Sequence, residues 1–323
     1  MTLTRMNARC FNQVLYEPDT NAITKTSSHE QKLREETMWY LELPEELRHY
    51  VPDIFSYSLQ KPVNVSLAYI PSPTLASLFV EEKLNPDRWD RVFAGITGLL
   101  VDFSRFPGEL RRTCLADMYI RKTFQRVSAF LARNEKARTF FKRGYYWLNG
   151  RLTLCPIKIF NEHRADFLQL LDDPKACIIH GDLCFSNMLY DPESETIKLV
   201  DPRGRFGKRG LYGDQRYDLA KIRHSLSGYE HLVRNLYSLK VTEKGLDLHI
   251  GLTEEQGRLR DQWDGLIRSL GYELPVIKKI EALLFLSMLP LHRESEERQL
   301  ALYALGTRLM YEAFDHERGG AEG

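Results

Sequence analysis

The first 70 residues alternate between strand-like runs and one segment with helical patterning. Turn-forming residues, Glu17 to Asn21, separate the first two runs. Ser28-His29-Glu30-Gln31 has the pattern of a capping box and predicts a helix over residues 29–43. This part of the chain is therefore predicted to be a small sheet with one helix. The strand-like runs cover residues 10–18, 21–28, 51–60 and 63–70.

Helical patterns dominate from Pro71 onwards, with a connector near Tyr69 to Pro73. The pattern predicts an α+β fold of two lobes. Residues 1–70 form a small N-terminal β-sheet lobe with one helix, and residues 71–323 form a larger, mainly helical lobe. The expected helices cover residues 86–106, 109–133, 214–239 and 276–314, the last one broken near Pro290. The expected short strands cover residues 151–157, 176–180, 187–190 and 197–201.

Composition narrows the class of protein. The chain has 323 residues, of which 43% are hydrophobic and 28% are charged, with a formal net charge of +1. These values are typical of a globular protein, and they offer no general attraction for nucleic acid or membrane surfaces. The longest apolar run, residues 283–291, is too short to cross a bilayer. Five scattered cysteines without a Cys-x-x-Cys pair indicate free thiols, so a cytoplasmic location is expected.

The candidate chemistry lies in one predicted hairpin. The apolar strand "CIIH" leads to Asp182, and Asn187 follows five residues later. The next strand turns near Pro192 and returns to end at Asp201. Because a hairpin returns its second strand beside the first, Asp201 is expected to lie near Asp182 and Asn187.

Two carboxylates and a carboxamide in this order suit phosphoryl transfer from a nucleotide. One carboxylate can accept the proton of an attacking hydroxyl, while the other and the amide oxygen hold Mg²⁺, which prefers oxygen ligands. A cation must also steady the phosphates, and Lys25 in the second strand is placed to do so. Glu36 or Glu35, in the following helix, could pair with Lys25.

The motif His180-Gly181-Asp182-Leu183-Cys184-Phe185-Ser186-Asn187 resembles the catalytic loop of aminoglycoside phosphotransferases and choline kinases, the small-molecule branch of the protein-kinase-like fold. "IKLVD", ending at Asp201, and "GDQRYDLAKI", residues 213–222, resemble further segments of that family. "SLAYIPSPTL", residues 66–75, resembles its adenine-binding hinge. The resemblance extends over about residues 10–230 and is strongest in residues 178–222.

The resemblance implies a kinase that uses ATP and Mg²⁺ to phosphorylate a hydroxyl of a small molecule. It implies the following roles: Asp182 as catalytic base, Asn187 and Asp201 as metal ligands, Lys25 with Glu36 as the phosphate clamp, Tyr69 and Ile70 at the nucleotide, and His180 and Asp218 as structural supports of the catalytic loop.

The chain departs from the kinase pattern in two places. The stretch expected to cover the phosphates, residues 5–12, has no glycine, since the first glycine is Gly95. Gly181 also stands where protein kinases carry an arginine that meets a phosphorylated activation loop, and no Ala-Pro-Glu follows Asp201. The glycine at position 181 and the missing Ala-Pro-Glu both favour a small-molecule acceptor over a protein acceptor.

A basic segment follows Asp201. Arg203, Arg205, Lys208 and Arg209 lie within seven residues. Arg203 and Arg205 are therefore candidates to contact an anionic acceptor, such as a sugar phosphate or sugar acid, or the nucleotide phosphates. The alternative is a solvated basic loop.

Residues 283–306 are similar to stretches of kinase-like proteins associated with capsule and surface-polysaccharide synthesis. This similarity favours a sugar-related acceptor, which His292 and Arg298 could contact.

Two other functions remain open from the sequence. The missing glycines fit a catalytically weak or inactive kinase-like nucleotide-binding protein with a regulatory or partner-binding role. A metal hydrolase using His180, Asp182 and Asp201 is the third hypothesis, but it assigns no role to Lys25 or Asn187. ATP or GTP as the nucleotide, the identity of the acceptor and the oligomeric state stay open.

Overall fold

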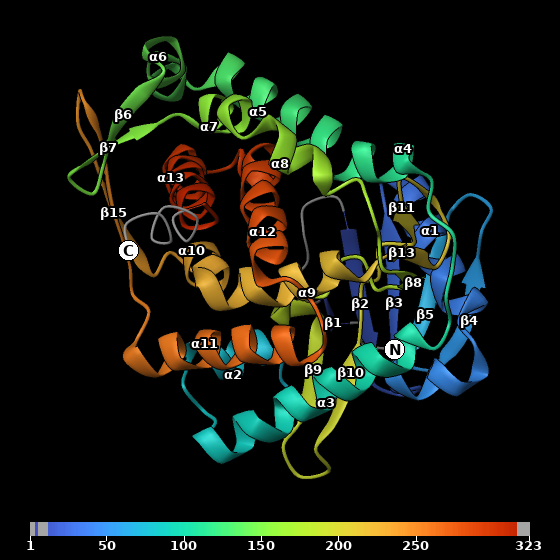
Figure 1. Ribbon diagram of the computed structural model, residues 1–323. Helices are drawn as coiled ribbons and strands as arrows, with labels where there is room; N and C mark the ends of the chain where they lie inside the picture. Colours follow the sequence, from blue (N-terminus) through green and yellow to red (C-terminus); the bar gives the residue numbers. More distant parts are fainter. Residues whose placement is uncertain (1–3, 6–11, 315–323) are drawn as a thin grey trace. The chain divides into compact units, whose positions relative to one another are not determined.

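The structure is a computed structural model that describes residues 4–5 and 12–314 (Figure 1). The chain forms two compact units: Met1–Glu109 with Ala176–Asp218, and Leu110–Lys175 with Leu219–Gly323, here called unit 1 and unit 2. The expected division into lobes at residue 70 stays a prediction. The stretch expected to cover the phosphates, residues 5–12, lies almost wholly outside the described residues. No helix of the described residues is both long and apolar enough to cross a membrane.

A five-stranded sheet opens unit 1, in the order β1-β2-β3-β5-β4 (Figure 1). In the centre, β3 pairs antiparallel with β2 and β5, so that Lys25 lies opposite Val14 and Val65. The buried positions of β3 are Ala22 and Lys25, so this strand buries the side chain of a lysine. The strands are β1 (Thr4–Arg5), β2 (Asn12–Glu17), β3 (Ala22–Ser27), β4 (Ile54–Ser58) and β5 (Asn64–Ala68).

One helix, α1 (Glu30–Glu42), accompanies this sheet, as the sequence predicts. The predicted capping box is wrong. The helix begins one residue later than expected, after His29, whose side chain makes no capping bond. Instead, the His29 backbone N–H donates to the Ser27 hydroxyl at 3.1 Å.

The rest of unit 1 includes the hairpin that follows residues 180–187. β9 pairs with β10 in antiparallel register, so that Met188 lies opposite Leu199, and β8 pairs with β13. The hairpin that was predicted from the sequence is therefore present. The elements are η1 (Glu45–Tyr50), α2 (Leu75–Val80), α3 (Pro86–Ser104), β8 (Ala176–Ile178), η3 (Phe185–Asn187), β9 (Met188–Asp191), β10 (Thr196–Leu199), β11 (Arg205–Phe206), β12 (Lys208–Arg209) and β13 (Tyr212–Asp214).

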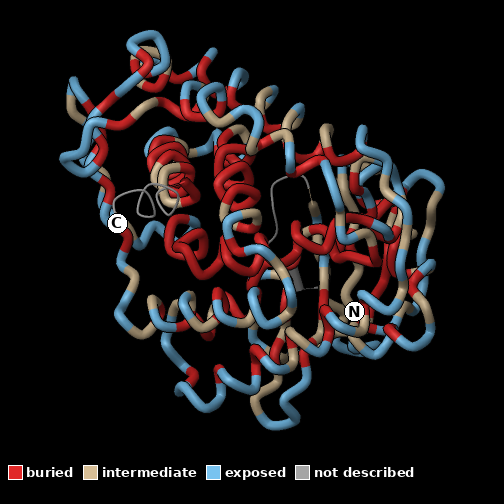
Figure 2. Tube along the Cα trace, in the orientation of Figure 1, coloured by how far each residue is buried: buried red, intermediate tan, exposed pale blue. Residues whose placement is uncertain are grey.

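Unit 2 is mainly helical and has one four-stranded sheet, in the order β14-β15-β6-β7. Its core includes α12 and α13, which pack on each other and are buried along most of their length (Figure 2). The helical elements are α4 (Arg112–Leu115), η2 (Ala116–Arg121), α5 (Lys122–Arg133), α6 (Glu135–Arg143), α7 (Pro156–Glu162), α8 (Arg164–Gln169), η4 (Ser225–Tyr229), α10 (Glu230–Val233), α11 (Glu254–Ser269), α12 (Leu274–Met288), η5 (Leu289–His292) and α13 (Glu296–Glu312). The strands are β6 (Tyr145–Leu148), β7 (Arg151–Leu154), β14 (Tyr237–Val241) and β15 (Gly245–Ile250).

The helix predicted over residues 214–239 is correct only in its first part. α9 (Gln215–His224) continues through η4 and α10 but ends at Val233. Asn235 then adopts a left-handed conformation with φ 60°, and residues 237–241 pair with β15 as a strand. Pairing with β15, which begins after only three intervening residues, outweighed the local helical pattern.

Candidate functional site

Lys25 is the first residue of the site and comes from β3. Its ammonium group lies 2.8 Å from both carboxylate oxygens of Glu36 on α1. It also lies 2.7 Å from Oδ1 of Asp201, just beyond β10. Of the two glutamates considered from the sequence, Glu36 is therefore the one that pairs with Lys25. One buried lysine joins the sheet, the helix and the catalytic hairpin within unit 1.

The charges of this cluster depend on one another. Burial disfavours the charged form of Lys25, but the carboxylates of Glu36 and Asp201 outweigh this effect and raise its pKa above the ordinary value. Burial raises the pKa of Glu36 to about 7, although the attraction of Lys25 acts in the opposite direction. The lysine thus stays a cation.

Asp201 has an unusual backbone conformation, with φ 57° in the left-handed region. Two groups of unit 1 hold it there. The Tyr40 hydroxyl on α1 accepts the Asp201 backbone N–H at 3.1 Å, and Lys25 binds the carboxylate. Non-glycine residues in this region often mark functional positions.

The loop of residues 180–187 is held by Asp218, a fully buried residue of α9. Its two carboxylate oxygens accept the backbone N–H groups of His180 at 2.7 Å and of Gly181 at 2.9 Å. Gly181 has φ 78°, and a Cβ atom there would come within 2.9 Å of the Arg203 side chain. The positive φ and this contact explain why glycine is favoured at the position.

His180 holds the loop through both ring nitrogens. Nε2 lies 3.0 Å from the carbonyl oxygen of Val200, and Nδ1 accepts the Asp182 backbone N–H at 3.3 Å. These two bonds require a neutral ring with its proton on Nε2. Burial lowers the pKa of His180 to about 4, which keeps this ring neutral at pH 7.

Asn187 and Asp201 lie at the same end of the hairpin, because the Val200 backbone N–H donates to the Asn187 carbonyl at 3.0 Å. The Asn187 side-chain nitrogen donates to the Asp182 carbonyl at 2.9 Å, which directs the amide oxygen away from that bond. The Asp201 side chain is 54% exposed. Asp182 itself is half-buried.

These oxygen donors fit Mg²⁺, which is often bound by one or two protein groups together with substrate phosphates and water. Asp201 offers a carboxylate that is accessible in spite of its bond to Lys25, and Asn187 offers an oriented amide oxygen. In the part of the chain that the structure describes, no group of three or more His, Cys, Asp or Glu side chains is placed to hold a metal.

Tyr69 and Ile70, predicted to contact the nucleotide, directly follow β5 and are half-buried. The Tyr69 backbone N–H donates to the Asn21 carbonyl at 2.9 Å, and its ring lies 4.4 Å from the Tyr16 ring between centroids. The segment after β5 is thus bound to the strands of the small sheet.

The two arginines predicted to meet an acceptor have different surroundings. Arg203 is half-buried and donates to the Tyr217 hydroxyl at 2.8 Å. Its backbone lies beside the loop of residues 180–187, because its N–H donates to the His180 carbonyl. Arg205 instead binds the carboxylate of Glu35 on α1. The basic segment is therefore not simply a solvated loop.

His292 and Arg298, the weaker acceptor candidates, lie in unit 2 and bind residues of that unit. His292 Nε2 lies 3.4 Å from the Tyr229 hydroxyl, and Arg298 binds Glu294 and Asn235. In unit 1, Cys184 is buried, and its thiol lies 3.2 Å from the Ser186 hydroxyl.

Sequence reasoning missed two aromatic residues of α1 that contact the site. The Trp39 indole N–H donates to the Ile179 carbonyl at 2.9 Å, and Tyr40 holds Asp201. Tyr40 lies four residues after Glu36, on the same face of the helix. That spacing was the available signal.

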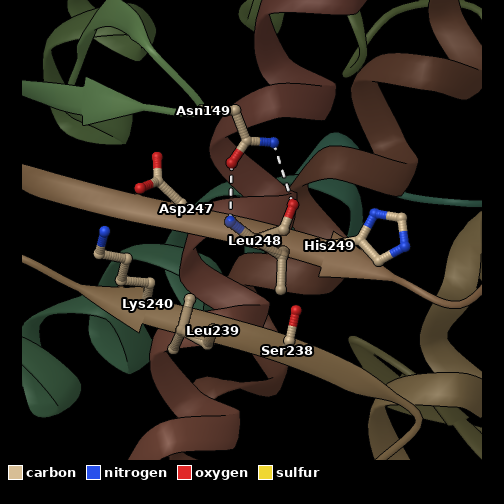
Figure 3. Close-up of a pocket in the computed structure, with 7 residues that line it drawn as sticks. All are labelled: Asn149, Ser238, Leu239, Lys240, Asp247, Leu248 and His249. Carbon is tan, nitrogen blue, oxygen red and sulfur yellow. Dashed lines mark hydrogen bonds between the residues drawn. The ribbon is translucent and has the colours of Figure 1, made fainter.

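Two of the cavities described are lined only by residues of unit 2. Figure 3 shows one of about 450 Å³ over β14 and β15, where the Asn149 side chain bonds to the backbone of Leu248. Lys240 and Asp247 lie at one end of it (Figure 3). A second cavity, of about 410 Å³, is lined by residues of α5, α13 and the turns beside them. Neither contains a residue predicted for the site.

No model of a protein family matches the sequence, and no curated protein matches it. Solved structures do match over nearly the whole chain. A thermostable mutant of the aminoglycoside phosphotransferase APH(4)-Ia is 10% identical, with a TM-score of 0.60, over 100% of this chain and 96% of that one. The streptomycin–ATP complex of APH(2")-IIa is 14% identical, with a TM-score of 0.54, over 94% and 93% of the two chains. ADP-bound APH(2'')-Ib is 12% identical, with a TM-score of 0.54, over 97% and 94%.

These structures confirm the predicted fold. The chain has the protein-kinase-like fold seen in aminoglycoside phosphotransferases, with a small N-terminal β-sheet region and a larger helical C-terminal region. At this low identity, the likeness extends to the fold alone.

Proposed function

We propose that this protein is a small-molecule kinase that transfers the γ-phosphoryl group of ATP to a hydroxyl, with Mg²⁺ as cofactor. The observation that carries the proposal is the bridge of Lys25 between Glu36 and Asp201, beside a loop that Asp218 holds through two backbone N–H groups. The fold adds support, because the similar structures include complexes with ATP and ADP.

Each residue has a role in this proposal. Asp182 accepts the proton of the acceptor hydroxyl, and Lys25, oriented by Glu36, contacts the phosphates. Tyr69 and Ile70 contact the base of the nucleotide. Asn187 and Asp201 would hold the metal, which supplies charge neutralisation to the phosphates when it is bound.

For the acceptor, we propose a sugar or an anionic sugar derivative, in the context of capsule or surface-polysaccharide synthesis. Arg203 supports an anionic acceptor, because it carries a positive charge beside the catalytic loop. Choline and aminoglycoside sites need acidic groups for their cations, and the basic segment does not suit them. The similarity of residues 283–306 to capsule-associated kinases supports the same class.

ADP formation tests this function directly. The purified protein, with ATP and Mg²⁺, is offered sugars, sugar acids, sugar phosphates, amino alcohols and aminoglycosides. We expect ADP to form with at least one sugar-type acceptor and to fall by at least about 100-fold in Asp182→Ala, as for loss of a general base. Asp191→Asn, which alters a half-buried carboxylate at the end of β9, is the control.

Two results would count against the proposal. Nucleotide binding without ADP formation for any acceptor would favour the inactive kinase-like protein. Phosphate release without an acceptor, lost in Asp182→Ala, would favour a hydrolase.

A further inference from the structure

An ion pair joins α1 to the segment that follows Asp201, residues 203–209. The Arg205 guanidinium Nε lies 2.9 Å from both carboxylate oxygens of Glu35. The Glu35 side chain is only 5% exposed. A second and more exposed pair joins Arg209 to Glu42, near the end of the same helix, at 3.1 Å.

The backbone of this segment also touches α1. Gly204 has φ 62°, and a Cβ atom there would lie 2.0 Å from the carbonyl oxygen of Glu35. Only glycine fits this approach without moving the helix or the segment. The backbone at residue 205 therefore lies close to α1, beside the Glu35 carboxylate that the Arg205 side chain binds.

Two adjacent glutamates of α1 thus bind cations from different parts of unit 1. Glu35 binds Arg205 of the segment, and Glu36 binds Lys25 of β3. Neighbouring side chains on a helix point about 100° apart, so a rotation or shift of α1 that breaks one pair displaces the other. We propose that Arg205 is a positioning residue, which holds α1 through Glu35 so that Glu36 meets Lys25.

The electrostatics of Glu35 support a permanent contact. Burial would raise the pKa of this carboxyl group, but hydrogen bonds from Arg205 and Gln31 outweigh it and lower the pKa below the ordinary value. The carboxylate is therefore ionised at neutral pH. A planar guanidinium that binds both oxygens of a carboxylate is more rigid than a pair formed by lysine.

This inference rests on the proposed function only for the role of Lys25 at the nucleotide, so its test includes a measurement that needs no activity. Hydrogen–deuterium exchange of the peptide covering residues 30–42 reports on α1 in the full-length protein. We expect Arg205→Ala to speed exchange there by about tenfold and to raise the KM for ATP by a similar factor. The KM for the acceptor should stay within about twofold.

Three further variants sharpen the test. Arg205→Lys keeps the charge but loses the two-oxygen contact, and it should give an intermediate effect. The charge swap Arg205→Glu with Glu35→Arg should recover part of the loss seen in Arg205→Glu alone. Arg91→Ala removes another exposed arginine of unit 1, paired with the exposed Glu195, and should change neither measurement.

Unchanged exchange of α1 in Arg205→Ala would overturn the inference, whatever the activity. A raised KM for the acceptor with an unchanged KM for ATP would also overturn it and would assign Arg205 to acceptor binding. If the wild-type protein transfers no phosphate at all, the proposed function fails, and the exchange measurement still decides whether Arg205 holds α1.

Discussion

Asp218→Asn tests whether the loop of residues 180–187 depends on a buried negative charge. The Asp218 carboxylate accepts two backbone N–H groups, those of His180 and Gly181, and is shielded from water. Asparagine has nearly the same shape but only one carbonyl oxygen, so its amide N–H group would face one of the two donors. The result is a lost charge-assisted bond and a buried N–H group without an acceptor.

The expected cost follows from these two losses. The charge-assisted hydrogen bond is worth about 1.5–3 kcal/mol and the unsatisfied donor costs about 1–3 kcal/mol more, so Asp218→Asn should cost about 3–5 kcal/mol. The free energy of unfolding of a typical protein is roughly 5–15 kcal/mol, so this cost would be a large share of it. With a slope of about 3 kcal/mol per molar, the urea midpoint should fall by about 1–1.7 M.

Urea unfolding followed by tryptophan fluorescence measures this change, since the Trp39 ring lies edge-on to His180 with centroids 5.8 Å apart. Asp191→Asn is the matched control, because Asp191 also accepts a backbone N–H, at 3.0 Å from Glu193, but in an exposed turn. Its midpoint should change little. Asp218 lies in the first turn of α9, where asparagine would stabilise the helix as well as aspartate does. An unchanged midpoint in Asp218→Asn would therefore mean that Asp218 only supports its helix, and our account of the loop would be refuted.

Two further predictions concern the charges of the site. Because burial lowers the pKa of His180 from 6.5 to about 4, the unfolded chain binds a proton between these values and the folded protein does not. As far as His180 is concerned, the free energy of unfolding should be highest above pH 6.5. It should fall by up to about 3 kcal/mol as the pH drops to 4. His180→Gln should flatten this part of the urea midpoint profile, and an equally steep profile would contradict the assignment. Lys25→Met leaves Glu36 buried without its cation and should destabilise the protein by about 3–5 kcal/mol. The double variant Lys25→Met with Glu36→Gln should recover part of this loss in a thermal or urea unfolding cycle, whereas additive effects would show that the two residues are not coupled.

The sequence could predict the catalytic hairpin because its determinants are local. Alternating strands with a turn between them bring residues 182, 187 and 201 to one end of a hairpin, and the observed register of β9 and β10 agrees with that pattern. The small sheet with one helix was predictable for the same reason. The strand at residues 237–241 was missed although its partner β15 is also close in the sequence, because the local pattern continues the preceding helix and hides the hairpin.

The amino-acid sequence by itself determined which residue types are available to the site and which of them share a hairpin. Only the tertiary structure decided their partners. Lys25 meets Asp201 from 176 positions away, and Arg205 meets Glu35 from 170 positions away. A charged residue in a sequence has many possible partners, and the choice depends on which surfaces are buried together. For that reason Arg205, which the sequence offers as an acceptor contact, binds a carboxylate of α1 in the folded protein.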